Sequence, residues 1–512
     1  MQSIVEGFAG QAERQPEKTV LLFEGKEFTY NQLYRQVVRF SEALKRWGLK
    51  RGERVAIFLE NCPEFVIAYL GTHLAGGVVV LVNTQYRQVE LRHILTDAEV
   101  RLCVTDLTGG EELARLKAEL PQLEALVLVG GGDIDAFQSF EFEAFLDTAP
   151  ASQSPVAFPS GEDLAIIAYT SGTTGRSKGA MLLHSNLASN IETLTSSWRW
   201  TENDRLLLTL PLFHAHGLMV GLHGTLTTGA SAELRRRFEA GPVFETLQQD
   251  SRITMFFGVP TMYGRLLAEA KQRNVTPRRL RLFVSGSAPL SEQLFYEFEE
   301  VFGQRILERY GMTETIMNTT NPYEGERRAG TVGKPFPGQE ARVVHVKTGE
   351  PLPDGESGEI EVRGPHVFKG YWKRPEATAE AFTPDGWFKT GDLGWRSPDG
   401  YFTINGRARE LIISGGYNVY PREVEEVLEQ HPNVAEAAVL GLPDPDLGEQ
   451  VVAVVVVAPG AKISGEELVA YCREQLASYK KPRRIIFADA LPRNALSKVQ
   501  KHLLKEQVEA NI

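Results

Sequence analysis

The sequence predicts an α/β protein: a large N-terminal domain of sheet-and-helix layers with a β-rich subdomain, followed by a small mobile C-terminal α+β domain. Three observations lead to this prediction. The chain has 512 residues, 42% of them hydrophobic, and a single core rarely serves a chain of this length. Helical periodicity alternates with short apolar runs up to about residue 285. Short apolar runs separated by turn sequences then dominate residues 330–405.

Helices packed on a sheet are expected in the first half of the chain. Residues 30–47 repeat apolar side chains with helical spacing, so a helix is expected there. The runs predicted as buried strands are residues 54–59, 77–82, 164–169, 205–210 and 281–284. Runs of this kind, separated by helical segments, indicate an α/β sheet covered by helices.

The remaining elements are expected to form the β-rich subdomain and the C-terminal domain. Turn sequences at residues 347–349, 354–355 and 397–400 separate the short strands of the subdomain. The C-terminal elements expected are a helix at 421–431, strands at 435–440 and 450–457, a helix at 464–477 and a strand at 484–487. We therefore expect one domain over residues 1–408 and a second over residues 409–512.

Composition and charge exclude several classes of function. The chain has 66 acidic and 55 basic side chains and a net charge of -11, which gives no electrostatic reason to expect nucleic-acid binding. The longest apolar run, residues 451–458, is far shorter than the roughly 20 residues that span a bilayer, and residues 1–20 lack a signal-peptide pattern. The three cysteines are widely separated, so neither a disulfide framework nor a zinc site is expected. We expect a cytoplasmic protein without integral membrane segments, either a monomer or a homodimer.

A glycine-rich segment follows the apolar run at residues 164–169. Residues 170–179 (TSGTTGRSKG) combine three glycines, several hydroxyl side chains and Lys178. Glycines let backbone N–H groups approach a ligand, and hydroxyls and an ammonium bind phosphate oxygens, so the segment predicts a polyphosphate site. Its spacing differs from the GxxxxGK[ST] pattern of P-loop enzymes, which disfavours a kinase or GTPase. Composition alone leaves a flexible Ser/Gly/Thr surface loop as the alternative.

Several motifs occur in the order typical of one known family. They are residues 169–179, 211–214 (PLFH), 310–314 (YGMTE), 358–364 (GEIEVRG), 390–392 (TGD), 406–407 with 415–416, and 491–498 (LPRNALSK). With these motifs the chain resembles the adenylate-forming superfamily, which comprises acyl-CoA synthetases, firefly luciferases and peptide-synthetase adenylation domains. The resemblance implies a reaction in which a carboxylate attacks the α-phosphate of ATP to give an acyl-adenylate and pyrophosphate, and a thiol then displaces AMP. It also implies ATP, Mg²⁺ and coenzyme A as cofactors and co-substrates.

The resemblance assigns most of the nucleotide site residue by residue. The residues that it implies for ATP or AMP binding are Thr170, Ser171, Gly172, Thr173, Thr174, Gly175, Lys178, Gly286, Ser287, Ala288, Glu308, Tyr310, Gly311, Met312, Thr313, Asp392 and Arg407. Among them Tyr310 would stack on adenine, Asp392 would accept hydrogen bonds from the ribose hydroxyls, and Arg407 would lie near the ribose and the phosphates. Without the family, they would be interpreted as a core tyrosine, a turn residue and a surface charge.

The catalytic groups that the resemblance implies are Lys498, Glu314 and His214. Lys498 would contact the α-phosphate and the attacking carboxylate, whereas Glu314 and Thr174 would bind Mg²⁺. The polar segment around Lys498 would by itself suggest a solvated surface lysine. His214 corresponds to an aromatic or His gate of the family, and with His216 it would position the acid or close the pocket behind it. A neutral core histidine is the alternative for His216.

The resemblance also implies a hinge and a CoA site. Arg409 stands where the family rotates its C-terminal domain between the two half-reactions, a position at which many members carry Asp or Lys. After the rotation, Gly415 and Gly416 would let the pantetheine thiol approach. Lys480 and Arg483 belong to a basic cluster that would contact the CoA phosphates, and a solvated charged face is the alternative.

The acid is indicated by the expected pocket residues. The segments that resemble the malonyl-CoA synthetase branch of the superfamily are residues 213–217, 281–290, 307–315, 317–327 and 491–501. Malonate keeps one carboxylate unreacted, and a buried anion must find a cation and hydrogen-bond donors. Arg309 is the first candidate for that cation and Arg327 the second, with His214 and Ser287 near the acid. The alternatives are an ion pair of Arg309 with Glu308 or another structural acid, and an exposed charged loop around Arg327.

The expected function is the ATP-dependent ligation of a short dicarboxylic acid to CoA, malonate first and methylmalonate second. The alternative is a medium- or long-chain fatty acid–CoA ligase, in which Arg309 would pair internally and the pocket would be apolar. An adenylation domain that loads a carrier protein is less favoured, with a separate carrier protein left open as the acceptor. A non-catalytic nucleotide-binding protein is disfavoured, because it has no chemical need for the full set of Lys178, Glu314, Asp392, Arg407 and Lys498.

Overall fold

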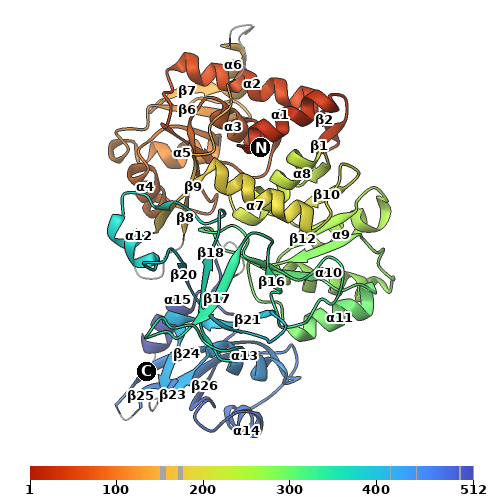
Figure 1. The fold of residues 1–512 in the computed structure, drawn as a ribbon, viewed down its shortest axis with the longest axis vertical. Coiled ribbons are helices and arrows are strands. Elements are labelled where there is room, and N and C mark those ends of the chain that lie inside the picture. The colour runs from red at the N-terminus through yellow and green to blue at the C-terminus, as the bar shows by residue number, and fades with distance from the viewer. Residues whose placement is uncertain (150–156, 171–176, 415–416, 446, 495–497, 511–512) are drawn as a thin grey trace.

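The computed structural model describes residues 1–149, 157–170, 177–414, 417–445, 447–494 and 498–510. Figure 1 shows the N-terminal helices and strands at the top, a smaller sheet at mid-height and the C-terminal elements at the bottom. The predicted α/β fold class is confirmed by this arrangement, which consists of two large sheets, one four-stranded sheet and a small sheet with its own helices.

The first large sheet has eight strands in the order β19-β9-β8-β4-β3-β5-β6-β7. Its strands are β3 (Arg54–Phe58), β4 (Val78–Leu81), β5 (Val100–Asp106), β6 (Ala125–Val129), β7 (Gln138–Glu141), β8 (Leu164–Thr170), β9 (Lys178–Leu183) and β19 (Gly370–Tyr371). The strands from β8 to β7 pair in parallel, whereas β9 and β19 run antiparallel to their neighbours. The predicted strands at 54–59, 77–82 and 164–169 correspond to β3, β4 and β8.

The second large sheet has nine strands in the order β16-β15-β14-β13-β12-β10-β11-β1-β2. Its strands are β1 (Thr19–Phe23), β2 (Lys26–Thr29), β10 (Arg205–Leu208), β11 (Ser231–Leu234), β12 (Met255–Gly258), β13 (Leu282–Ser285), β14 (Leu307–Tyr310), β15 (Thr319–Thr320) and β16 (Lys334–Pro335). Strands β1 and β10 to β14 pair in parallel. Their carboxyl ends therefore lie along one edge of the sheet, where ligand sites of parallel sheets form.

Helices cover the two large sheets, and most of them follow a strand. They are α1 (Ile4–Arg14), α2 (Tyr30–Trp47), α3 (Pro63–Leu74), α4 (Gln88–Asp97), α5 (Leu107–Ala114), α6 (Phe142–Asp147), α7 (His184–Ser197), α8 (His223–Thr228), α9 (Ala240–Gln249), α10 (Pro260–Arg273) and α11 (Glu292–Phe302), with short helices η1 (Lys117–Glu119) and η2 (His216–Leu222). The predicted helix at residues 30–47 is α2, which begins at a capping box of Thr29 and Gln32 and ends at Gly48. The largest hydrophobic cluster contains side chains from both sheets, so the two sheets share one core.

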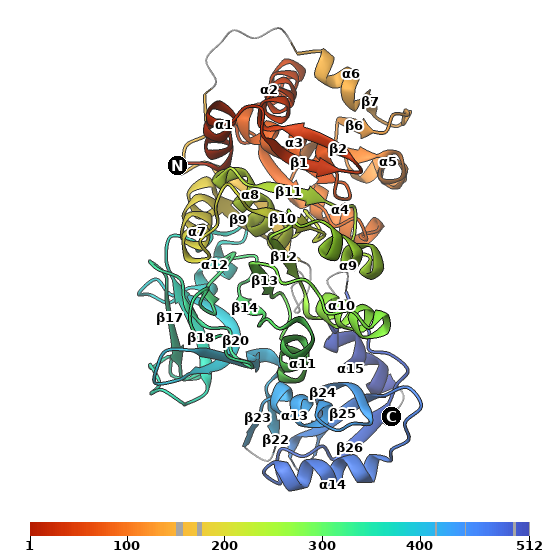
Figure 2. The ribbon, with the colours of Figure 1, turned by 90° about the vertical axis from the view of Figure 1, so that its right-hand side faces the viewer.

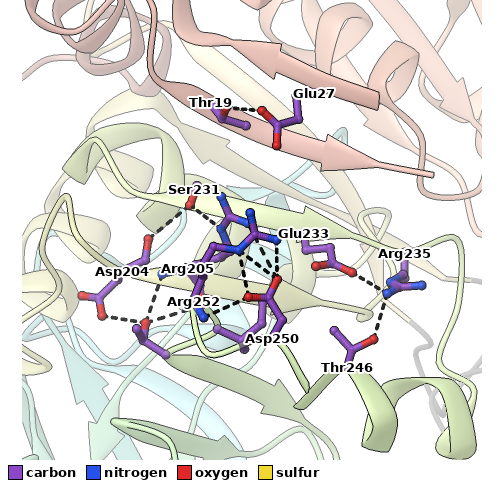
Figure 3. Close-up of polar contacts among 12 residues, drawn as sticks. Thr19, Glu27, Asp204, Arg205, Ser231, Glu233, Arg235, Thr246, Asp250 and Arg252 are labelled. Atoms are coloured by element: carbon purple, nitrogen blue, oxygen red, sulfur yellow. Dashed lines mark hydrogen bonds and ion pairs between the residues drawn. The ribbon is translucent and has the colours of Figure 1, made fainter. Parts of the chain in front are cut away.

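A polar network joins the amino-terminal ends of the central strands of the second sheet (Figure 3). Asp204, just before β10, is buried and accepts hydrogen bonds from Thr254 Oγ1 at 2.8 Å and from Arg281 Nε at 2.7 Å. Arg205 Nε donates to Ser231 Oγ at 3.2 Å, at the start of β11. These bonds connect β10, β11, β12 and β13 at the edge opposite the carboxyl ends of the parallel strands.

The predicted β-rich subdomain is a four-stranded antiparallel sheet in the order β17-β18-β20-β21. Its elements are β17 (Glu340–Val344), β18 (Gly358–Arg363), α12 (Pro375–Ala381), β20 (Phe388–Arg396) and β21 (Phe402–Arg407). Figure 2 shows this teal sheet beside β14 and above the C-terminal elements. Its inward side chains join the largest hydrophobic cluster, so the sheet is part of the same folded unit as the N-terminal sheets.

The C-terminal elements form a small α+β unit with two hydrophobic clusters of its own. They are η3 (Ala408–Glu410), β22 (Ile412–Ser414), β23 (Tyr417–Val419), α13 (Pro421–Glu429), β24 (Val434–Asp444), β25 (Gly448–Val457), α14 (Gly465–Gln475), β26 (Arg484–Phe487) and α15 (Lys501–Ala510). The expected division at residues 408 and 409 stays a prediction. Within the described ranges, no helix has the length and apolar character that crossing a bilayer demands.

Candidate active site

A cavity of about 1800 Å³ lies where the carboxyl edges of the large sheets meet the four-stranded sheet and the C-terminal unit. The side chains that line it and carry charge or polar groups predicted for the site include Lys178, His214, Ser287, Arg309, Glu314, Arg407 and Lys498. These residues come from segments more than 300 positions apart in the sequence. The fold therefore brings most of the predicted catalytic groups to one place.

The predicted phosphate segment connects two antiparallel strands of the first sheet. Thr170 at the end of β8 pairs with Lys178 at the start of β9, and both line the cavity. The Lys178 ammonium lies over the ring of Tyr371, with Nζ 5.1 Å from the ring centroid. The predicted ligands Ser171, Gly172, Thr173, Thr174 and Gly175 lie outside the described residues.

Two residues beside the cavity hold an unusual backbone conformation. Ser287, after β13, has φ 70°, and Ile316, in the loop after β14, has φ 60°. A positive φ is uncommon for residues other than glycine and costs free energy, most of all for a β-branched side chain, and such strain collects at functional sites. Gly311 lies against this loop, since a Cβ at position 311 would stand 1.9 Å from the carbonyl oxygen of Ile316. Met312 and Thr313 line the cavity, whereas Ala288 does not.

Tyr310, Asp392 and Arg407 form a connected group in the wall. Arg407 Nε lies 2.7 Å from Asp392 Oδ1, and the Tyr310 hydroxyl donates to Asp392 Oδ2. The register of β20 and β21 pairs Asp392 with Arg407 directly. Arg407 lines the cavity, whereas Tyr310 and Asp392 are buried beside it. The negative charge of Asp392 raises the pKa of Arg407, so the guanidinium stays charged.

Lys498 reaches the cavity from the C-terminal unit. Its N–H donates to Asn494 Oδ1 at 3.0 Å, and the N–H of Asn494 donates to the carbonyl of Lys498 at 2.9 Å. These two bonds join Lys498 directly to Asn494. Lys498 lines the cavity, so its exposed surface faces the interior of the site. Enclosure by the walls and the nearby charge of Arg407 lower the pKa of Lys498 to about 8.

Arg309 is a buried cation with few partners. Its side chain is 2% exposed, and its Nε and Nη2 atoms have no hydrogen-bond partner among the described residues. The expected alternative, an ion pair with Glu308, is not formed: Glu308 Oε1 instead accepts from the N–H of Leu290 at 3.0 Å. Burial lowers the pKa of Arg309 to about 9. The guanidinium packs over Gly286, where a Cβ would stand 2.4 Å from Arg309 Cζ.

His214 and His216 stand beside Arg309 at the same end of the cavity. Burial and the neighbouring cations Lys498 and Arg309 lower the pKa of His214 to about 3, so its ring is neutral. The N–H of His216 donates to His214 Nδ1 at 3.3 Å, which makes Nδ1 an acceptor and leaves the proton on Nε2. His216 is buried and stacks on Phe257 with ring centroids 6.2 Å apart.

Comparisons with known proteins agree with this geometry. The model of the AMP-binding enzyme family matches residues 8–372, and that of the AMP-binding enzyme C-terminal domain matches residues 423–498. The chain belongs to the AMP-binding enzyme family. The malonate–CoA ligase of Arabidopsis thaliana is 36% identical over 98% of this chain and 88% of its own length. The long-chain-fatty-acid–CoA ligase of Bacillus subtilis is 35% identical over 97% of this chain and 93% of its own length.

Solved structures of other AMP-binding enzymes have the same fold. ATP-bound MatB from Rhodopseudomonas palustris superposes with a TM-score of 0.89 at 40% identity and covers 99% of both chains. The o-succinylbenzoate coenzyme A synthetase MenE of Bacillus subtilis, in complex with ATP and magnesium ion, superposes with a TM-score of 0.85 at 32% identity and covers 98% of this chain and 99% of its own. The family and the CoA-ligase type are thus shown. Relatives named for different acid substrates have about the same sequence identity to this chain, 36% and 35%.

The Glu314 carboxylate of this AMP-binding enzyme fits a divalent cation. It is 6% exposed, lines the cavity and forms no ion pair with any described Lys or Arg. Burial raises its pKa, although the hydrogen bond from Tyr371 and the charge of Arg407 act in the opposite direction. Mg²⁺ binds one or two protein carboxylates together with substrate phosphates. In the part of the chain that the structure describes, no cluster of three or more His, Cys, Asp or Glu side chains offers a dedicated metal site.

Several predicted residues do not come to the cavity. The Arg327 guanidinium donates to the carbonyls of Arg305 at 2.7 Å, Tyr323 at 3.1 Å and Pro322 at 3.3 Å, so its hydrogen-bonding capacity serves the loop itself. Lys480 pairs with Glu423 within the C-terminal unit. Arg483 is exposed on that unit. Gly415 and Gly416 lie outside the described residues, as does the side chain of Arg409.

One cavity residue was missed by the sequence analysis. Tyr371 lines the cavity, and its hydroxyl donates to Glu314 Oε1 at 3.0 Å. It lies in the two-residue strand β19, 57 positions from Glu314. A short strand with no charged side chain gives no chemical signal in a single sequence, so only the fold reveals this contact.

Proposed function

We propose that this AMP-binding enzyme ligates malonate, and methylmalonate as a second substrate, to coenzyme A through an acyl-adenylate, with release of AMP and pyrophosphate. The observation that carries the proposal is Arg309, a guanidinium that is 2% exposed, lines the acid end of the cavity and has no carboxylate partner among the described residues. An anionic group on the substrate would supply that partner, and the unreacted carboxylate of malonate is such a group.

In the first half-reaction, a carboxylate oxygen of malonate attacks the α-phosphorus of ATP, and the bond to the β-phosphate breaks. Lys498 supports this step as a cation beside the α-phosphate and the attacking carboxylate, with Arg407 on the ribose side. Residues 170–178 hold the pyrophosphate with backbone N–H groups and Lys178. Glu314 and Thr174 would hold Mg²⁺, which would neutralise part of the negative charge of the phosphates.

The distal carboxylate of malonate contacts Arg309, His214 and Ser287 in this proposal. The neutral His214 carries its proton on Nε2, as its Nδ1 accepts from the N–H of His216 at 3.3 Å. A neutral donor suits this place, because a third positive charge beside Arg309 and Lys498 would be repelled. Arg327 is left out of the acid site because its guanidinium is bound by backbone carbonyls.

In the second half-reaction, the CoA thiol attacks the acyl carbonyl, the C–S bond forms, and the C–O bond to AMP breaks. We propose that rotation at Arg409 exchanges Lys498 for the segment with Gly415 and Gly416, and that Lys480 and Arg483 then contact the CoA phosphates. Lys480 and Arg483 do not line the cavity in the present orientation of the C-terminal unit. We therefore propose that they contact CoA only after this unit has rotated.

The proposal is tested by CoA consumption in separate reactions with malonate, methylmalonate and octanoate, each with ATP and Mg²⁺. Malonate or methylmalonate should be consumed well ahead of octanoate. Activity on octanoate without activity on malonate would replace the dicarboxylate by a medium- or long-chain fatty acid and remove the proposed role of Arg309.

A further inference from the structure

We propose that Tyr371 is a positioning residue that holds the Glu314 carboxylate and the Lys178 ammonium in place while keeping these opposite charges from pairing with each other. This inference rests on the proposed adenylation reaction, in which Glu314 serves the metal and Lys178 serves the phosphates. It assigns separate tasks to the hydroxyl and to the ring of one tyrosine.

The hydroxyl of Tyr371 orients the Glu314 carboxylate. It donates to Glu314 Oε1 at 3.0 Å, and the same segment holds the backbone of Glu314, because the N–H of Phe368 donates to the Glu314 carbonyl at 2.8 Å. Two bonds from one segment therefore fix both the main chain and the carboxylate. A carboxylate with one oxygen bound in this way keeps the other oxygen for a cation, and partners of this kind orient metal ligands.

The ring of Tyr371 contacts the Lys178 ammonium and holds it in place. Lys178 Nζ lies 5.1 Å from the ring centroid, within the distance at which an aromatic face attracts an ammonium. Glu314 and Lys178 thus contact the same side chain, yet neither forms an ion pair with a described residue. A direct Glu314–Lys178 pair would satisfy each charge with the other and leave both less available to a metal and to phosphates.

The backbone of Tyr371 is tied to the strand that leaves the phosphate segment. Tyr371 pairs antiparallel with Ala180 of β9, and the N–H of Trp372 donates to the Gly179 carbonyl at 2.8 Å. The N–H of Tyr371 itself donates a hydrogen bond to Thr378 Oγ1 at 2.9 Å. Because β19 is bonded to β9 beside Lys178, the tyrosine places Glu314 relative to the phosphate segment and not only relative to its own loop.

The experiment separates the two tasks with Tyr371→Phe, which removes only the hydroxyl, and Tyr371→Leu, which removes the hydroxyl and the ring. Tyr401→Phe is the matched control: the Tyr401 hydroxyl also donates one hydrogen bond, to the Glu326 carbonyl at 2.9 Å, and its ring also carries cations, but it does not line the cavity. The probes are Mn²⁺, followed by its electron paramagnetic resonance signal, and α,β-methylene ATP, which the reaction cannot cleave.

We expect Tyr371→Phe to weaken Mn²⁺ binding to the nucleotide complex about 10- to 100-fold, the usual effect of removing a hydrogen-bond partner of a metal ligand. Nucleotide binding in buffer with a chelator should stay within about twofold of wild type, because the ring still supports Lys178. Tyr371→Leu should weaken nucleotide binding in the chelator buffer as well. Tyr401→Phe should change neither measurement.

Two outcomes overturn the inference. Unchanged Mn²⁺ binding in Tyr371→Phe would show that the hydroxyl does not hold Glu314 for a metal, and equal loss of metal-free nucleotide binding in Tyr371→Phe and Tyr371→Leu would show that the ring has no task of its own. Thermal unfolding of all three variants checks that the fold is retained. Failure of the proposed adenylation is recognised separately, since wild-type protein would then release no pyrophosphate with any acid although it still bound Mn²⁺ and nucleotide, whereas a preference for another acid would leave this inference intact.

Discussion

Replacement of Arg309 by Met tests the anion site through two effects of opposite sign. Burial lowers the pKa of Arg309 from its usual 12.5 to about 9. Each tenfold change in proton affinity corresponds to about 1.4 kcal/mol, so burying the charge without an anion costs on the order of 5 kcal/mol of folding free energy. A base whose folded-state pKa is depressed carries this cost at every pH below that pKa. Arg309→Met, which keeps an unbranched apolar stem and removes the charge, should therefore raise the stability of the ligand-free protein.

The same substitution should weaken malonate use severely. Loss of one member of a buried, hydrogen-bonded charge pair costs about 2 to 5 kcal/mol, or about 30- to 5000-fold in affinity. The KM for malonate should rise by at least the lower factor, while the KM for ATP changes little. In thermal unfolding, malonate should raise the Tm of wild type and leave the Tm of Arg309→Met unchanged. Equal increases in both KM values, or a Tm below that of wild type without ligand, would refute the reasoning.

Three further predictions concern groups with a defined charge or contact. Lys498→Ala should abolish pyrophosphate release while ATP binding and Tm stay near wild type; unchanged turnover would remove Lys498 from the mechanism. Because the pKa of Lys498 is lowered to about 8, the adenylation rate should fall as the pH rises through about 8 and the ammonium loses its proton. Lys498→Arg should remove this fall, although its rate should be lower throughout. A wild-type rate that does not change from pH 7 to 10 would contradict this role of Lys498. Burial lowers the pKa of His184 to about 4, below its value near 6.5 in the unfolded chain, so the unfolded state binds a proton first as the pH falls. The free energy of unfolding should therefore drop by about 3 kcal/mol between pH 6.5 and 4. In urea unfolding, His184→Gln should show a weaker dependence of this free energy on pH, and the same dependence as wild type would show that His184 is not its source.

Local sequence signals predicted the elements whose ends are determined locally. Helix α2 was predicted from its apolar periodicity with its observed bounds, residues 30–47. Thr29 and Gln32 cap its start, and Gly48, with φ 104°, ends it. The strand predicted at 205–210 ends earlier, at Leu208, because an apolar run continues past the last ladder bond into the segment that leads to the cavity. The order of strands in the sheets depends on long-range pairing and could not be read from periodicity.

The candidate site was predictable where a motif carries its own chemistry and not where chemistry depends on neighbours. Lys498 and Glu314 stand in motifs, and both line the cavity. Arg309 and Arg327 were both candidates for the cation, yet Arg309 is left without an acidic partner among the described residues, whereas Arg327 is bound by the carbonyls of Arg305, Pro322 and Tyr323. Whether a buried charge is satisfied is decided by tertiary contacts, as is the hydrogen bond from Tyr371 to Glu314 across 57 positions.

The most direct test of the central claim is pyrophosphate release with ATP and Mg²⁺ over malonate, methylmalonate, succinate, acetate and octanoate, each with and without CoA. The account predicts release that depends on the acid, is highest with malonate or methylmalonate, and turns over repeatedly only when CoA is present. Preference for acetate or octanoate over malonate would contradict a cavity in which Arg309 binds a second carboxylate.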